Sequence, residues 1–255
     1  MKESLEQQSR GQIIEDFLRQ NKSPDVTKEE VEDVDAVIRL IFEKFEAELK
    51  SHHQECDADD FLDRILATLD EAHGNFNNIF PENKVLWQEF IKKLEASPDL
   101  VHIMRIEPLD YYKDVGNVMD PVVTHASIEA VTEELKRRNP ELADDYVSND
   151  PDKILRVAQT IVQSDLFYYF IDKEMIDQEM SSSGHDHIGT SMVKLGYMSR
   201  HYELAPTFVA KFKVAAGKFD GKEKVVLDGT HRALVSAIAK RSQYVLEVDM
   251  DKIIG

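Results

Sequence analysis

The chain has 255 residues and a formal net charge of −18 at pH 7. Residues 151–255 contain equal numbers of basic and acidic side chains, so the entire acidic excess lies in the first 150 residues. Acidic surfaces repel nucleic acids and anionic lipids, because proteins bind both by neutralising phosphate groups. We therefore expect no nucleic acid partner and no membrane partner. A small phosphorylated ligand would not be repelled from residues 181–255, which carry 11 basic and 8 acidic side chains.

Cysteine content and hydropathy bear on where the protein resides. Cys56 is the only cysteine, so no intrachain disulfide can form, and the simplest location is the reducing cytoplasm. The longest strongly apolar runs, such as residues 166–171, are about six residues long, whereas a membrane-spanning helix needs about 20. Residues 1–17 lack the apolar core of a signal peptide. We therefore expect a soluble cytoplasmic protein.

The first clear helix pattern begins near residue 27. Apolar side chains recur at spacings of three and four between residues 31 and 45, which places them on one stripe of a helix. Thr27 and Glu30 form a capping-box pattern immediately before this stripe. The pattern therefore predicts an amphipathic helix with an acidic outer surface.

Two more helices and a strand are predicted in the next part of the chain. One helix runs from residue 57 or 59 to residue 73, with Gly74 as its C-terminal stop. Another follows Pro81 and carries its own apolar stripe. Residues 100–106 have the composition of a short strand, and Pro108 breaks that pattern.

The middle of the chain is also predicted to be helical. Residues 124–140 form a helix with a basic end that must stop near Pro140. Asp150 then caps a long helix with Pro151 at its first position. Residues 181–189 have the composition of a loop or hinge.

The apolar period changes from helical to two after that loop. Strands are predicted within residues 207–214, 223–227 and 243–249, with a helix over residues 230–241 between the last two. A strand, a helix and a strand in this order suggest a βα unit on a small sheet. The sequence therefore predicts an α+β protein with an acidic, predominantly helical region over residues 1–180, followed by a small α/β region over residues 181–255.

The turn between the strand at 223–227 and the following helix is the strongest candidate site. Gly229 allows the backbone to approach a ligand closely, and Thr230 is a good N-cap for the helix. The free N–H groups and the positive dipole end of that helix favour an anion. His231 and Arg232 would add a switchable donor and a fixed cation, and Asp228 would act as a metal ligand or a base. Alternatively, these residues form only a structural turn.

Residues 225–249, "VVLDGTHRALVSAIAKRSQYVLEVD", resemble the strand, Asp-Gly-x-His-Arg turn and helix of the ParB and sulfiredoxin-like superfamily. The preceding residues 204–214, "LAPTFVAKFKV", are similar to the strand that leads into this motif. The resemblance implies a ParB/sulfiredoxin-like fold for the C-terminal region, with residues Asp228 to Arg232 as the nucleotide-phosphate loop. It implies a nucleotide such as ATP, ADP or CTP with Mg²⁺ as the cofactor. It also implies phosphoryl transfer as one reaction among several that the superfamily carries out.

The leading hypothesis is therefore an intracellular nucleotide- or phosphate-binding protein, with phosphoryl transfer as its candidate reaction. Other residues suggest two alternatives. His185 and His187 lie one residue apart and point the same way in an extended chain, so with His201 or His231 they could form the metal site of a hydrolase. The second alternative is a non-catalytic interaction or adaptor protein. In that case the acidic helix over residues 29–48 would dock a basic protein partner.

Overall fold

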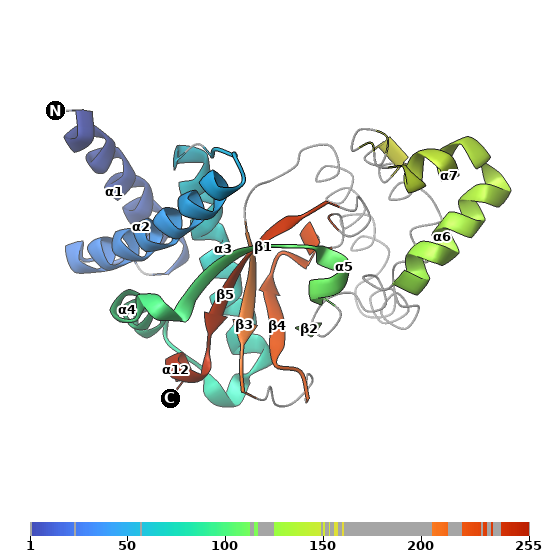
Figure 1. The fold of residues 1–255 in the computed structure, drawn as a ribbon. Coiled ribbons are helices and arrows are strands. Elements are labelled where there is room, and N and C mark those ends of the chain that lie inside the picture. Colours follow the sequence, from blue (N-terminus) through green and yellow to red (C-terminus); the bar gives the residue numbers. More distant parts are fainter. Residues whose placement is uncertain are drawn as a thin grey trace.

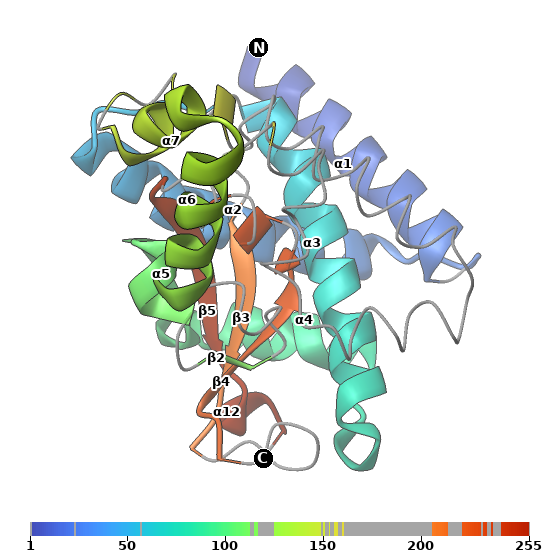
Figure 2. The same cartoon turned by 90° about the vertical axis from the view of Figure 1, so that its right-hand side faces the viewer.

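The computed structural model of the chain (Figures 1 and 2) describes residues 2–22, 24–56, 58–112, 115–116, 125–148, 150, 153, 156–157, 160, 206–213, 221–230, 232–233, 236 and 241–254. The N-terminal part is helical, with α1 (Lys2–Asn21), α2 (Lys28–Ser51), α3 (Ala58–Ile79) and α4 (Trp87–Ala96). The elements that follow are β1 (Val101–Ile106), α5 (Pro108–Tyr111), β2 (Val115–Gly116), α6 (His125–Arg138), α7 (Pro140–Val147), β3 (Thr207–Lys211), β4 (Lys224–Asp228), β5 (Gln243–Asp249) and α12 (Asp251–Ile254). The predicted α+β class, a mostly helical N-terminal region followed by a small sheet near the C-terminus, is confirmed.

Helix α2 begins where the sequence predicts. The Thr27 hydroxyl accepts a hydrogen bond from the backbone N–H of Glu30, and the Glu30 carboxylate accepts one from the backbone N–H of Thr27, at 3.2 and 2.7 Å. This is the complete capping box. In the predicted apolar stripe, Val31 is partly buried and the other four residues are buried, namely Val34, Ile38, Ile41 and Phe45. Val37 and Leu49 extend the buried face of the helix.

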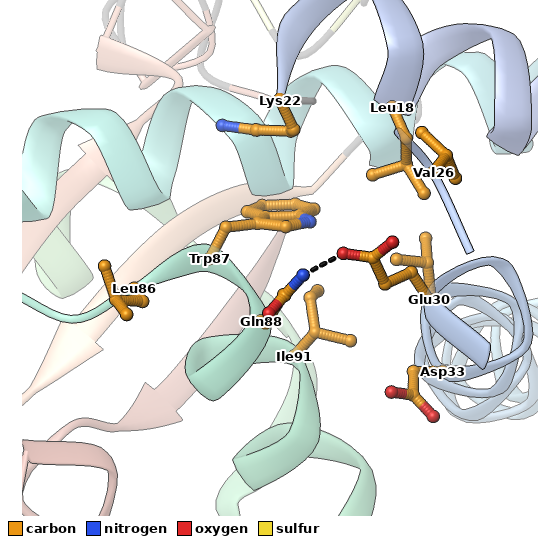
Figure 3. Close-up of a pocket in the computed structure, with 10 residues that line it drawn as sticks. Leu18, Lys22, Val26, Glu30, Asp33, Leu86, Trp87, Gln88 and Ile91 are labelled. Carbon is orange, nitrogen blue, oxygen red and sulfur yellow. Dashed lines mark hydrogen bonds between the residues drawn. The ribbon is translucent and has the colours of Figure 1, made fainter. Parts of the chain in front are cut away.

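The next two helices differ from prediction at one end each. Helix α3 passes through Gly74 and ends at Ile79, so Gly74 is an interior residue and the predicted stop is wrong. Pro81 begins a short 3₁₀ turn, and α4 starts only at Trp87. Helices α1, α2 and α4 contribute the side chains that line a pocket (Figure 3).

The sheet has the strand order β1-β5-β3-β4-β2. Strands β5 and β3 are parallel, as are β4 and β2, whereas the β1–β5 and β3–β4 pairs are antiparallel. The strands predicted near residues 100, 207, 223 and 243 are all present. Strand β3 lies between β4 and β5, so the two strands that flank the predicted helix at 230–241 are not neighbours. The division of the chain into two regions at residue 180 stays a prediction. The sheet contains β1 and β2 from before this residue and β3, β4 and β5 from after it.

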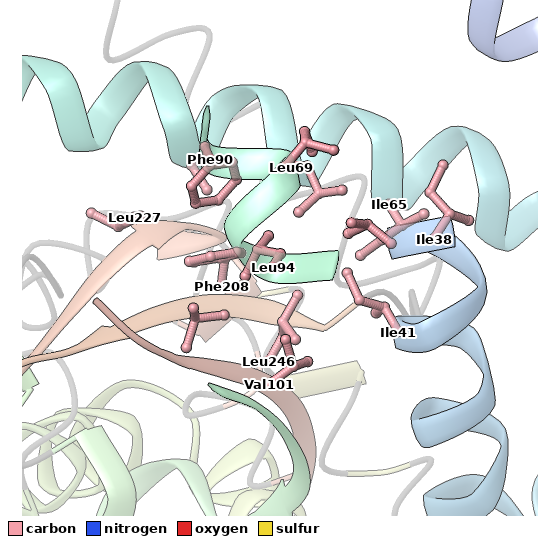
Figure 4. Close-up of a cluster of buried hydrophobic side chains, with 14 of the residues drawn as sticks. Ile38, Ile41, Ile65, Leu69, Phe90, Leu94, Val101, Phe208, Leu227 and Leu246 are labelled. Atoms are coloured by element: carbon pink, nitrogen blue, oxygen red, sulfur yellow. The ribbon is translucent and has the colours of Figure 1, made fainter. Parts of the chain in front are cut away.

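One face of the sheet packs against the N-terminal helices and forms the main core (Figure 4). On β3, Phe208 and Ala210 face this core, whereas Val209 faces the opposite side, in agreement with the predicted alternation. The core brings together side chains from α2, α3, α4 and four strands, including Ile38, Ile41, Ile65, Leu69, Phe90, Leu94, Val101, Phe208, Leu227 and Leu246. The opposite face carries a smaller apolar cluster around Val209, Val226 and Val245.

The middle of the chain contains a pair of contacting helices, α6 and α7. Helix α6 ends at Arg138, two residues before Pro140, as predicted. The side chain of Asn139 then caps α7 by accepting a hydrogen bond from the N–H of Leu142 at 3.3 Å. Most of the helix predicted after Asp150, and the loop predicted at 181–189, lie outside the described residues.

Candidate functional site

The Asp228–Arg232 turn follows a strand end that is held from two sides. The side-chain amide of Asn75, on α3, donates to the carbonyl oxygen of Leu227 at 2.6 Å. On the other side Asp228 pairs with Phe208 of β3, next to an irregularity between Phe208 and Val209. Helix α3 and strand β3 therefore fix the position from which the turn begins.

Gly229 occupies a position that a larger residue would not fit. Its φ is +96°, in the region that favours glycine. A Cβ added there would lie 2.8 Å from Oγ1 of Thr207, and 3.0 and 3.1 Å from Nη2 and Nε of Arg232. The backbone of the turn thus lies directly against a strand hydroxyl and a guanidinium group.

The helix after the turn begins at Thr230, as predicted, but its N-cap is Gly229. Thr230 is already helical, and the carbonyl oxygen of Gly229 accepts a hydrogen bond from the N–H of Ala233 at 2.9 Å. Gly229 therefore occupies the N-cap position assigned to Thr230 from the sequence. The backbone N–H groups of Thr230 and Arg232 belong to the first turn, where no carbonyl of the helix can accept from them.

Arg232 folds back over the turn that precedes it. Its Nη2 donates to Oδ2 of Asp228 at 2.5 Å and to the carbonyl oxygen of Pro206 at 3.3 Å. The two side chains are only 14% and 19% exposed. Nε of Arg232 is buried and has no hydrogen-bond partner among the described residues. The guanidinium is thus positioned by Asp228, and the Asp228 carboxylate is neutralised by it.

A buried chain of hydrogen-bonded side chains lies next to the turn and begins at Thr207. The side-chain amide of Gln243 donates to Oγ1 of Thr207 at 2.5 Å, and its Oε1 accepts from the Tyr112 hydroxyl at 2.9 Å. All three residues are at most 4% exposed. Hydrogen-bonded polar groups at this depth hold one arrangement, because breaking a bond would leave a buried group unpaired.

A second charged group lies on the same face of the sheet, around Glu247. This glutamate is 3% exposed, and its carboxylate contacts Nζ of Lys224 at 2.6 Å and Nζ of Lys211 at 3.5 Å. It also accepts from the Tyr111 hydroxyl at 3.0 Å. Burial alone would raise the pKa of Glu247, but the bonds and charges of Lys224, Tyr111 and Lys211 hold it below its usual value. Burial and the neighbouring carboxylate both raise the pKa of Tyr111.

The Glu247 group has a net positive charge, because two lysines share one carboxylate. Lys211 and Lys224 remain 50% and 29% exposed, so part of this charge is accessible on this face of the sheet. Thr207, Gln243 and Glu247 were not among the site residues predicted from the sequence. Each is a polar residue within a predominantly apolar strand. Gln243 and Glu247 are an even number of residues apart on β5 and so lie on the same face, which could have indicated a polar stripe on one face of the sheet.

The structure does not describe the three histidines among the predicted site residues. His231, His185 and His187 lie outside the described residues. Within the part of the chain that the structure describes, no three His, Cys, Asp or Glu side chains gather as a metal site would require. Nor is any helix in that part long and apolar enough to cross a membrane.

The sequence matches no family model, and comparisons with curated proteins and with solved structures find no match either. The resemblance to the ParB and sulfiredoxin-like superfamily therefore depends on the motif residues themselves.

Proposed function

We propose that this chain binds a nucleotide or another small phosphorylated ligand at the Asp228–Arg232 turn. The supporting observation is the close packing of the Arg232 guanidinium on Gly229 at the first turn of a helix. N–H groups that no carbonyl of the helix can pair, the positive end of the helix dipole and a fixed guanidinium then lie at the same end of one helix. Guanidinium groups bind phosphate oxygens well because their donors match the spacing of those oxygens.

The Asp228 carboxylate influences which form of the ligand binds. It lies 2.5 Å from Arg232, so it repels a bare phosphate while it orients the guanidinium. Mg²⁺ commonly binds through one carboxylate together with substrate phosphates. The turn offers one such carboxylate, so the metal would arrive with the nucleotide rather than occupy a site made by the protein alone. A Mg²⁺–nucleotide complex is therefore the preferred ligand.

Phosphoryl transfer is the reaction that the superfamily resemblance adds to this proposal. Asp228 would then serve as metal ligand or base and His231 as donor or acid. The cytoplasmic location belongs to the same proposal and depends on the single cysteine.

Thermal unfolding in the presence of ATP, ADP and CTP, each with and without Mg²⁺, tests the binding. A ligand that binds only the folded state raises its melting temperature. We expect at least one Mg²⁺–nucleotide to do so, and Arg232→Ala to abolish the rise. Arg39→Ala is the matched control, because Arg39 pairs with Asp35 four residues earlier, as Arg232 does with Asp228.

The Asp228→Asn variant separates two effects of Asp228, namely its negative charge and its role in orienting the Arg232 guanidinium. The amide oxygen of asparagine can still accept the bond from Arg232, but the negative charge is gone. We expect this variant to bind Mg²⁺-free nucleotide more tightly than the wild-type chain and to lose most of the benefit of Mg²⁺. No shift with any nucleotide, or equal shifts in the Arg232→Ala variant, would contradict the proposed function.

A further inference from the structure

The pocket between α1, α2 and α4 is remote in sequence from the turn and belongs to the acidic part of the chain (Figure 3). Its volume is about 220 Å³. Apolar side chains from all three helices and their connections form its walls, among them Leu18, Val26, Val34, Trp87 and Ile91. Glu30 and Asp33 of α2 add two carboxylates beside this apolar surface. Lys22 adds one ammonium group, which lies 4.5 Å from the centroid of the Trp87 ring and is paired with Asp70 outside the pocket.

Leu86, at the edge of the pocket, is an unfavourable residue at its position, because it is exposed to water and does not cap the helix that follows it. It is 71% exposed, which makes it the most exposed large apolar side chain among the described residues. It also occupies the N-cap position of α4, with φ −69° and ψ 147°, and provides no capping hydrogen bond. Serine, threonine, aspartate or asparagine would cap this helix, whereas leucine is among the poorest residues there. A partner that covered Leu86 would remove this apolar side chain from water.

Asp33 lies at the pocket with its charge weakly compensated. Its side chain is only 18% exposed, and its ion pair with Lys92 spans 3.8 Å. Lys92 is closer to Glu29, at 2.9 Å. Glu30 differs from Asp33, because both its oxygens already accept hydrogen bonds, from Thr27 and Gln88. Asp33 is therefore the carboxylate best placed to receive a further cation.

The size of the pocket favours a side chain over a free small molecule. Pockets for drug-sized ligands measure about 300–1,000 Å³, and this one is smaller. Its volume suits a single large apolar side chain, the usual anchor of a protein interface. The acidic excess of the first 150 residues favours a basic partner.

We propose that this pocket docks a basic segment of a partner protein. One aromatic or large aliphatic side chain of the segment enters the pocket and covers Leu86, and a neighbouring lysine or arginine pairs with Asp33. This site is separate from the Asp228–Arg232 turn and does not depend on the function proposed there.

A random peptide display library, selected on the full-length chain, tests the proposal. Selected peptides are expected to share a large apolar residue with lysine or arginine beside it. The chain has a single tryptophan, and Trp87 lines the pocket, so its fluorescence reports binding of each synthesised peptide directly. Binding should weaken as salt concentration rises.

Two variants and their matched controls locate the binding. Asp33→Asn and Leu86→Ser should each weaken binding on the order of tenfold. Glu46→Gln removes the same charge from the far end of α2, and Val147→Ser removes an apolar side chain that is 55% exposed on α7. Both controls should bind as the wild-type chain does, and so should Arg232→Ala. Leu86→Ser gives α4 a cap, so its melting temperature should not fall and unfolding cannot explain lost binding.

Several outcomes would overturn the inference. One is the recovery of no peptides, or of peptides without basic and apolar residues. Another is equal affinity of the two pocket variants and the wild-type chain. A third is peptide binding that leaves Trp87 fluorescence unchanged. A dimer in sedimentation that Leu86→Ser dissociates would instead identify a second copy of this chain as the occupant.

Discussion

Gly229 and Gly221 form a matched pair of substitution sites that separates backbone strain from steric contact. Both have a positive φ, at +96° and +81°. A Cβ added at Gly221 would meet no described heavy atom within 4 Å, whereas one at Gly229 would lie 2.8 Å from Oγ1 of Thr207. Gly221→Ala therefore measures the conformational cost alone, and Gly229→Ala adds the displacement of Thr207 or Arg232.

The expected magnitudes follow from these contacts. An alanine forced into the left-handed region costs about 1–2 kcal/mol, and both variants share this loss. The change in unfolded-chain entropy is also shared and cancels in the comparison. At Gly229 the added Cβ must displace Thr207 or Arg232, which disturbs the bond of Thr207 with Gln243 or that of Arg232 with Asp228, at a cost of about 1–3 kcal/mol. We expect Gly221→Ala to lose about 1–2 kcal/mol and Gly229→Ala about 2–5 kcal/mol of unfolding free energy.

Urea unfolding followed by circular dichroism measures both free energies, and an unchanged slope with denaturant shows that the unfolded states are comparable. Gly229→Ala should also lose the nucleotide-induced rise in melting temperature, whereas Gly221→Ala should keep it. Equal losses of stability in the two variants would refute the reasoning, because the contact of Gly229 with Thr207 and Arg232 would then cost nothing to disturb.

Two further predictions concern α3. Gly74 lies inside this helix and a Cβ added there meets nothing among the described residues within 4 Å, so Gly74→Ala should stabilise the chain by about 0.5–1 kcal/mol in the same urea assay. Burial, followed by the charge of Lys22, lowers the pKa of His73 below its usual 6.5, although its bond to the Val85 carbonyl and the charge of Asp70 oppose this. Its contribution to stability should therefore be complete above about pH 6.5 and decline as the pH falls through the folded-state pKa, and His73→Gln should flatten that decline in unfolding measured against pH.

Elements controlled by local chemistry could be predicted from the sequence. The Thr27–Glu30 capping box needs only residues three apart, and the alternation of Phe208 and Val209 follows from the strand period. The predicted helix stop at Gly74 was wrong because a glycine inside a helix costs only about 1 kcal/mol, which packing can outweigh. Burial of Leu69 and Phe76 on either side of it outweighs that cost.

The surroundings of the turn could not be predicted in the same way. Thr207 meets Gln243, and Lys224 meets Glu247, because β3 lies between β4 and β5. Strand order depends on how the whole chain packs, and no local pattern near Asp228 encodes it. The sequence motif could therefore indicate a site at the turn, but not the buried polar groups beneath it.

The ion pair at the turn does not by itself exclude phosphate from Arg232. A guanidinium has five N–H donors in a rigid plane, and the contacts of Arg232 with the described residues use only Nη2. Asp228 and the Pro206 carbonyl therefore fix the plane of the group through Nη2, and Nε is buried, so the two N–H groups of Nη1 are the donors left for an anion. Arg232 is also packed against Gly229, so little conformational freedom is left to lose when a ligand binds. In the proposed function, Asp228 would therefore hold Arg232 in place for an anion at the cost of some repulsion, and a divalent cation carried by the ligand would remove that repulsion.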